Sequence, residues 1–248
     1  MKKLIVVAND LEGSGKSTFA RSFQHLLTNQ NVNHMFITTD EQDMDESFDG
    51  DYWDFDEQLN ISQLIRAIDR NDVVLLDVRS GYARTWHEFF TQNEVDTVLA
   101  EIDASMTLVI PCHDSEPCHD ELIELAELFS DSTDYVIPHF PLPTDRSSKQ
   151  VWNGSYAAKV TDYLGALHFE MPKLGKELAV ALESHDLSLS QALTQLDELP
   201  RFVEVAAMQW LEQISKAING TGEYVLPQPT KLKSFLKKIK SSEKTVTA

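Results

Sequence analysis

The segment with the clearest chemistry is a short glycine turn that leads directly into a lysine and two hydroxyl residues. In order, its members are Gly13, Ser14, Gly15, Lys16, Ser17 and Thr18. An apolar run at residues 4–8 precedes the turn, and apolar residues at helical spacing follow it. A turn without bulky side chains exposes backbone N–H groups, and the following helix adds the positive end of its dipole. This segment can therefore surround a phosphate.

The side chains of the segment suit the phosphates of a nucleotide. In a loop of this kind the lysine reaches the β- and γ-phosphates, and the hydroxyl that follows it binds Mg²⁺. The sequence predicts a nucleotide site in residues 13–18, with Lys16 on the phosphates and Ser17 on the metal. The alternative is an ordinary glycine–serine turn that holds a lysine by chance.

The loop departs from the general pattern GxxxxGK[ST] at its first position, where Asp10 replaces the glycine. Asn and Asp adopt left-handed backbone more readily than most residues. We therefore expect Asn9 and Asp10 to make the turn that a glycine makes in other phosphate loops.

Short apolar runs alternate with amphipathic stretches, a pattern typical of a parallel sheet with helices on both faces. Strands are predicted at residues 4–8, 34–38, 73–77, 106–111, 135–137 and 166–170. Helices are predicted from residue 16 and at residues 59–68, 122–129, 173–183, 188–196 and 201–218. The predicted fold class is α/β: a mainly parallel, doubly wound, P-loop NTPase-like sheet with a helical C-terminal third. In such a fold the nucleotide lies at the carboxyl ends of the strands.

The string from Ala8-Asn9 to Lys16-Ser17 resembles the loop of the ParA/MinD family of P-loop ATPases, which usually has the pattern AN-x-KGG-x-GK[ST]. That family, which includes plasmid-stability and mobilisation proteins, also lacks the first glycine of the general motif. The resemblance covers roughly residues 1–170.

The resemblance implies ATP and Mg²⁺ as cofactors and gives two carboxylates a role. Asp40 stands in a TDEQ segment that is similar to the family's D-x-D-P-Q, whose switch carboxylate orients the attacking water or the metal. Asp77 ends the strand 73–77, where the family has its second carboxylate on the metal side. By this resemblance Lys16, Asp40 and Asp77 are catalytic, and Ser17, Asp40 and Asp77 bind the metal.

The same resemblance implies a role in plasmid or mobile-element maintenance, partition or conjugation, with an adaptor protein or a second copy of the chain as partner. Leu11, however, stands where the family has a lysine that reaches across a dimer, and Glu12 stands where it has a glycine. Val78-Arg79-Ser80-Gly81 replaces the usual Thr/Ala-Pro-Pro-Gly, and His139 stands where an adenine-binding Asn is expected. We therefore expect slow or partner-dependent hydrolysis.

Two arginines, Arg79 and Arg84, are candidates for the positive charge that Leu11 does not supply. Two other functions use the same loop. A small-molecule kinase closes an arginine-bearing lid over the phosphates, but residues 85–145 contain no Arg or Lys. A non-hydrolysing module, in which nucleotide stabilises a binding surface, is compatible with Leu11 and Glu12.

The charge of the chain is unevenly distributed. Among 248 residues, 40 acidic and 21 basic side chains give a net charge of −19. Residues 228–248 hold six Lys and one Glu, which leaves −24 on the rest of the chain. Such a body repels nucleic-acid backbones, so we expect no direct DNA binding by it. We expect one nucleotide-binding domain over residues 1–226 and a flexible Lys-rich tail over 227–248.

The two cysteines indicate a reducing compartment and no disulfide scaffold, and no apolar run approaches the length of a membrane span. We expect a cytoplasmic protein. Two segments leave alternatives open. The first contains Cys112-His113 and Cys118-His119. These four residues could bind zinc, one of the histidines could line the nucleotide pocket, or the cysteines could simply be buried beside polar histidines. The ten carboxylates of residues 40–57, interleaved with aromatic residues, form either a switch or docking segment or a solvated loop.

Overall fold

The computed structural model describes residues 1–41, 50–55, 59–141, 152–185, 187–194, 196, 199–220 and 222–227. The Lys-rich tail predicted over residues 227–248 lies outside these residues except for Pro227. Residues 42–49, 56 and 57 of the acidic segment 40–57 also lie outside them. Where that acidic segment is described, Trp53 and Phe55 are buried, and the Phe55 ring lies 6.2 Å from that of Trp86. These two aromatic side chains therefore belong to the core.

The described residues form one eight-stranded sheet in which every pairing is parallel. The strands are β1 Lys2–Val7, β2 His34–Thr38, β3 Asp51–Tyr52, β4 Val73–Asp77, β5 Ala104–Val109, β6 Cys112–His113, β7 Asp134–Phe140 and β8 Leu167–Glu170. The order across the sheet is β3-β2-β4-β1-β5-β7-β6, with β8 paired to β7. The predicted parallel sheet is confirmed, and β1 lies at its centre.

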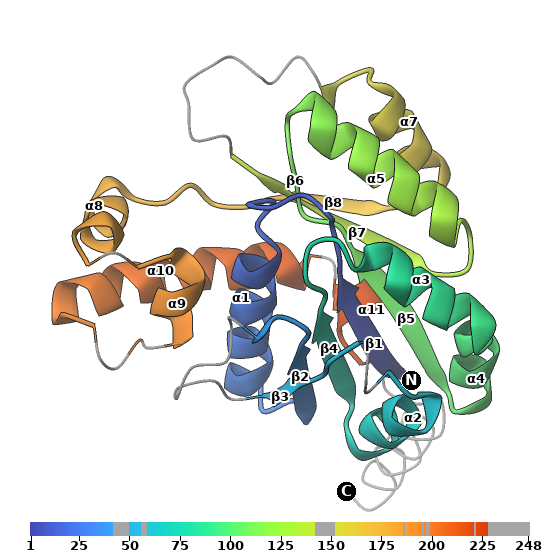
Figure 1. Cartoon of the computed structure of the whole chain (residues 1–248). Coiled ribbons are helices and arrows are strands. Elements are labelled where there is room, and N and C mark those ends of the chain that lie inside the picture. Colours follow the sequence, from blue (N-terminus) through green and yellow to red (C-terminus); the bar gives the residue numbers. More distant parts are fainter. Residues whose placement is uncertain are drawn as a thin grey trace, which may run out of the picture.

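Helices cover both faces of the sheet (Figure 1). On one side lie α1 Lys16–Asn29, α8 Lys176–Ser184, α9 Leu189–Thr194, α10 Arg201–Asn219 and α11 Gly222–Val225. On the other lie α2 Ile61–Arg70, α3 Ala83–Gln92, α4 Val95–Glu101, α5 Glu116–Phe129 and α7 Tyr156–Tyr163. Strand β1 alternates between the two cores, because Leu4 and Val6 face one and Ile5 and Val7 face the other. The fold is therefore doubly wound, as predicted.

The predicted elements need several corrections. Helices α3, α4, α7 and α11 and the short strand β3 were not predicted, and α5 begins at Glu116 rather than at residue 122. Helix α3 is rich in aromatic residues of modest helix propensity. Its buried residues Ala83, Trp86, Phe89 and Phe90 nonetheless recur at helical spacing, so packing rather than propensity accounts for this helix.

The strand predicted at residues 106–111 is interrupted at Pro111. Strand β5 ends at Val109, and β6 resumes at Cys112 beside the same strand β7 and with the same register offset. Proline has no N–H to donate to the ladder, which explains the break between the two pieces. The continuation brings Cys112 opposite His139 at the carboxyl edge of the sheet.

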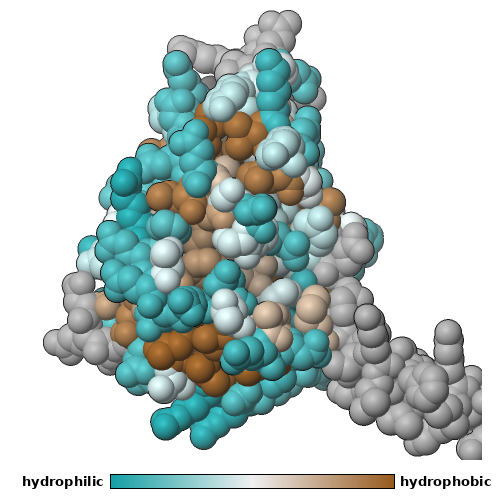
Figure 2. All heavy atoms as spheres, turned by 90° about the vertical axis from the view of Figure 1, so that its right-hand side faces the viewer, coloured by the Kyte–Doolittle hydropathy of each residue, from teal (hydrophilic) through white to brown (hydrophobic). Residues whose placement is uncertain are grey.

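The face formed by α3, α4 and α5 carries both polar and apolar side chains (Figure 2). Figure 2, which views the molecule from the side of α3, α4 and α5, shows apolar side chains gathered in separate patches between polar ones. Among the described residues, no helix combines the length and apolar character needed to cross a bilayer.

Candidate functional site

The phosphate loop lies between β1 and α1, at the carboxyl edge of the sheet. Gly13 and Gly15 have φ angles of +71° and +97°, in the left-handed region that L side chains rarely adopt. Gly15 also precedes α1 as its N-cap, and it has no side chain with which to cap the first N–H groups of the helix. These N–H groups therefore remain available to an anion.

The loop also contains a buried hydroxyl that lacks a partner. Ser14 is 1% exposed, and its Oγ has no hydrogen bond to any described residue. A buried polar atom without a partner is costly, and a bound group that supplies one removes that cost. Together with the left-handed glycines, this atom fits a loop built around a phosphate.

Lys16 is 8% exposed, and its ammonium is held inside the site. Its Nζ donates to the carbonyl oxygen of Leu11 at 3.1 Å and to Ser80 Oγ at 2.8 Å. Burial lowers the pKa of Lys16, and the charge of Asp77, followed by that of Asp10, opposes this shift. The carboxylates therefore help to keep the ammonium charged in a poorly solvated position.

A cavity of about 510 Å³ opens over the loop, within the size range of small-molecule sites. It is lined by Glu12, Gly13, Ser14, Gly15, Lys16, Ser17, Thr18, Asp40, Asp77, Val78, Arg79 and Ser80. All eight residues that the sequence analysis assigned to the site line this one cavity. Four further residues, at position 12 and positions 78–80, complete its wall.

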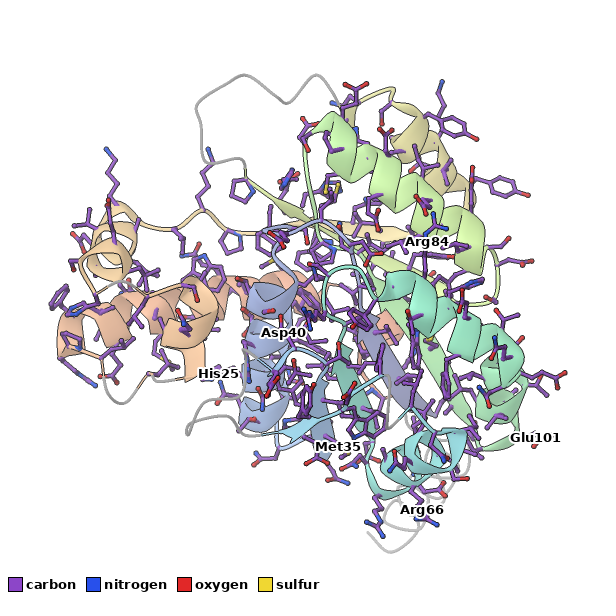
Figure 3. The ribbon with its side chains drawn as sticks, in the orientation of Figure 1. His25, Met35, Asp40, Arg66, Arg84 and Glu101 are labelled. Carbon is purple, nitrogen blue, oxygen red and sulfur yellow. The ribbon has the colours of Figure 1, made fainter. Side chains whose placement is uncertain are left out.

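Asp40 and Asp77 reach the cavity from neighbouring strands. The parallel pairing of β2 with β4 places Thr38 beside Asp77, so both strands end at the same edge. Asp77 is 3% exposed, and its backbone oxygen accepts a hydrogen bond from Thr39 N–H at 3.1 Å. Asp40, labelled beside α1 in Figure 3, is oriented by a 3.1 Å bond from its N–H to Thr38 Oγ1. The Ser17 hydroxyl and these two carboxylates are the oxygen donors that Mg²⁺ prefers.

Asp10 does not make a left-handed turn. Neither Asn9 nor Asp10 has a positive φ, so the expectation drawn from the missing glycine is wrong. Asp10 Oδ1 instead accepts hydrogen bonds from the N–H groups of Gly81 and Ala83, at 2.9 and 3.0 Å. The carboxylate thereby ties the phosphate loop to the loop that follows β4.

Asn9 fixes the start of the phosphate loop from the other side. It is buried, its Nδ2 donates to Pro111 O at 2.8 Å, and its Oδ1 accepts from Leu11 N–H at 2.8 Å. Leu11 is half-buried and packs against the core, while Glu12 is exposed at the rim of the cavity. The position of the family's lysine is therefore occupied by a packing residue.

The two arginines considered as sources of charge differ in position. Arg84, labelled in Figure 3, pairs with Glu124 of α5 and is not among the residues that line the cavity. Arg79 lines the cavity beside Lys16 and Asp77. Of the two candidates, Arg79 is thus the one that the fold brings to the site.

The arrangement of the Cys-His pairs does not support the zinc alternative. Among the described residues, no group of three or more His, Cys, Asp and Glu side chains is arranged to hold a metal ion. Cys112 and Cys118 are both fully buried, and their mutual hydrogen bond together with burial raises the pKa of the Cys112 thiol. The ring nitrogen Nδ1 of His113 lies 2.9 Å from Ser115 Oγ, and the backbone oxygen of His113 accepts a hydrogen bond from Cys112 Sγ at 3.4 Å.

A cluster of histidines around Trp152 was not predicted from the sequence. His139 Nε2 lies 3.0 Å from His168 Nδ1, and the rings of His119, His139 and His168 lie 4.6–5.6 Å from that of Trp152. Burial, with the neighbouring His168 and His119, lowers the pKa of His139 to about 4. The members of this cluster lie between 13 and 49 positions apart along the chain, so sequence spacing offered no signal.

No protein family of known sequence pattern matches the chain, and no curated protein is significantly similar to it. Among solved structures, the chain is similar to the MinD cell division protein of Aquifex aeolicus. The TM-score is 0.49 at 12% identity over 86% of this chain and 96% of that one. A McdA–ATP complex from Cyanothece has a TM-score of 0.44 at 16% identity, over 88% and 96% of the two chains. FlhF complexed with GMPPNP and Mg²⁺ has a TM-score of 0.38 at 14% identity, over 69% and 66%. All three similarities are weak, with TM-scores below 0.5 and identities of 12–16%.

The hydrogen bonds of Asp10 predict that replacing it by the glycine of the general motif lowers the stability of the protein. Asp10→Gly and Asp10→Ala leave the N–H groups of Gly81 and Ala83 without their acceptor, which is expected to cost about 1–3 kcal/mol of unfolding free energy. Asp10→Asn keeps an acceptor oxygen and is expected to cost less. Urea unfolding measures these differences, with the exposed neighbour Glu12→Ala as a control within about 0.5 kcal/mol of wild type. A glycine variant as stable as wild type would contradict the role of this carboxylate.

The histidine cluster predicts a loss of stability on acidification. His139 has a folded-state pKa of about 4, below the ordinary value of about 6.5 for an unfolded chain. Between these pH values the unfolded state binds a proton that the folded state does not, so stability falls as the pH decreases. Measured from about pH 7 to about pH 4, wild type should lose more unfolding free energy than His139→Gln, whereas the exposed His185→Gln should follow wild type. Parallel curves for wild type and His139→Gln would refute this origin.

Proposed function

We propose that this protein binds ATP together with Mg²⁺ in the cavity over residues 13–18. The observation that carries the proposal is the position of Lys16: its ammonium is nearly buried, at the start of α1, within a loop held open by two left-handed glycines. Backbone N–H groups and this lysine surround the phosphates, and Ser14 Oγ gains a partner in a phosphate oxygen.

The charges of the cavity favour a nucleotide that carries a metal. Three carboxylates, those of Glu12, Asp40 and Asp77, face two cations, Lys16 and Arg79. Ser17, Asp40 and Asp77 would hold Mg²⁺, which when bound neutralises part of the phosphate charge. We therefore infer that ATP without Mg²⁺ binds poorly.

We further propose that hydrolysis is slow, or depends on a partner. Lys16 already balances several carboxylates, and the side chain at position 11 is an apolar one that packs on the core. Less positive charge is then available to stabilise the negative charge that develops on the transferred phosphoryl group in the transition state.

By its resemblance to the ParA/MinD family, we propose a cytoplasmic role in plasmid or mobile-element maintenance, partition or conjugation. The partner would be an adaptor protein or a second copy of the chain, bound by a domain that spans residues 1–226. The acidic composition of that domain supports a protein partner rather than direct contact with DNA.

Nucleotide binding is tested by thermal unfolding with and without Mg-ATP. A ligand that binds only the folded state stabilises it, by about 2.7 kcal/mol at a hundredfold excess over its Kd. We expect wild type to unfold at a higher temperature with Mg-ATP, and Lys16→Ala to lose this shift. Lys176→Ala, which changes an exposed lysine of α8, should retain it, and EDTA should remove it. Equal shifts in wild type and Lys16→Ala would refute the proposal.

Slow hydrolysis is tested by phosphate release from Mg-ATP. Turnover of purified wild type alone is expected to stay well below about 1 per second, the lower end of ordinary enzyme rates. Leu11→Lys adds a cation next to the loop and is expected to raise turnover without weakening nucleotide binding. Wild-type turnover at ordinary enzyme rates would overturn this part of the proposal.

A further inference from the structure

Arg79 is the second cation of the nucleotide cavity. Its side chain is exposed, and its guanidinium carbon lies 5.6 Å from the centre of the Tyr82 ring. Among the described residues no carboxylate forms an ion pair with it, in contrast to Arg84 and Glu124. A guanidinium stacked on an aromatic ring at the rim of a cavity can turn toward a ligand without first breaking a salt bridge.

The backbone that carries Arg79 is held at three points. Arg79 N–H donates to Thr39 Oγ1 at 2.8 Å, and Ser80 Oγ accepts from Lys16 Nζ at 2.8 Å. The N–H groups that follow, at Gly81 and beyond, donate to Asp10. The loop after β4 is therefore anchored to β2's end, to the phosphate loop and to its lysine, while the arginine side chain remains exposed.

These anchors place residue 80 at the tip of Lys16 and residue 79 next to it along the chain, in the wall of the same cavity. In a loop of this type the lysine reaches the β- and γ-phosphates, while the backbone N–H groups surround the α- and β-phosphates, which are nearer the nucleoside. Ser80 Oγ accepts a hydrogen bond from the tip of that lysine, so residues 79 and 80 lie on the side of the cavity that the outer phosphates of a bound nucleotide would face. A diphosphate lacks the outermost of these phosphates, the group that would come nearest to Arg79.

We propose that Arg79 is the residue by which this site distinguishes a nucleoside triphosphate from a diphosphate. The inference rests on the proposed nucleotide binding and adds a specificity-determining residue to it. The planar guanidinium donates to two γ-phosphate oxygens at once, a geometry that lysine does not reproduce. Asp10 and Thr39 act as positioning residues, because they hold the backbone from which the arginine reaches.

The test compares two ligands and four proteins by isothermal titration calorimetry. The ligands are ADP and a non-hydrolysable ATP analogue, each with Mg²⁺, so that turnover plays no part. Wild type is expected to bind the triphosphate more tightly than ADP. Arg79→Ala should lose about tenfold or more in triphosphate affinity, the value of a hydrogen bond to a charged group, with ADP affinity unchanged. Arg79→Lys should recover part of the loss.

Arg84→Ala is the matched control, because it removes an arginine five positions away whose partner is Glu124 and which does not line the cavity. Its affinities for both ligands should equal those of wild type. Melting temperatures without ligand, measured for all four proteins, show whether any variant has lost its fold. If Arg79→Ala does not fold, the comparison of Arg79→Lys with wild type still tests the inference.

The remaining outcomes each overturn the inference. If the Arg79 variants lost affinity for both ligands equally, Arg79 would be a general phosphate contact. If they lost no affinity for either ligand, Arg79 would not take part in binding. Wild type that binds both ligands equally well would show no discrimination to explain. If wild type binds neither ligand, the proposed nucleotide binding itself fails, and this result differs from all the others.

Discussion

Lys16 brings an ammonium group to a position that is almost closed to solvent, and burying a charge is costly unless hydrogen bonds and opposite charges offset the cost. Two oxygen acceptors, Leu11 O and Ser80 Oγ, and the fields of Asp77 and Asp10 supply that compensation. They come from two separate stretches of the chain, the loop between β1 and α1 and the end of β4 with the loop that follows it. The site therefore exists only when β1, α1, β4 and the loop after β4 are all in place.

The carboxyl edge of the sheet is where this assembly becomes possible. Parallel strands all end on one side, so the residues that follow β1, β2 and β4 meet there without long connections. Asp10 and Thr39 then bind the backbone after β4, which carries Ser80 and Arg79. A movement of this loop would change the positions of both Lys16 and the end of β2, because hydrogen bonds join the loop to each of them.

Local patterns predicted much of the fold. Strands β2 and β4 match the predicted residues because each is a short, nearly continuous apolar run between polar residues. Helix α3 was missed because its aromatic residues have weak helix propensity, and its buried stripe is meaningful only against Phe55 and the core of that face. The broken strand at Pro111 was predicted as a single run, since a register shared with β7 is invisible in the sequence.

The phosphate loop itself could be predicted from contiguous residues, because its function depends on backbone N–H groups, two glycine conformations and the start of one helix, all set within six positions. The roles of Asp10, Arg79 and Arg84 could not, because they depend on contacts made over 40 to 73 positions of chain. Those contacts depend on the order in which the strands pair in the sheet. Only the folded sheet brings Arg79 to the cavity, pairs Arg84 with Glu124, and turns a missing glycine into a carboxylate that holds the neighbouring loop.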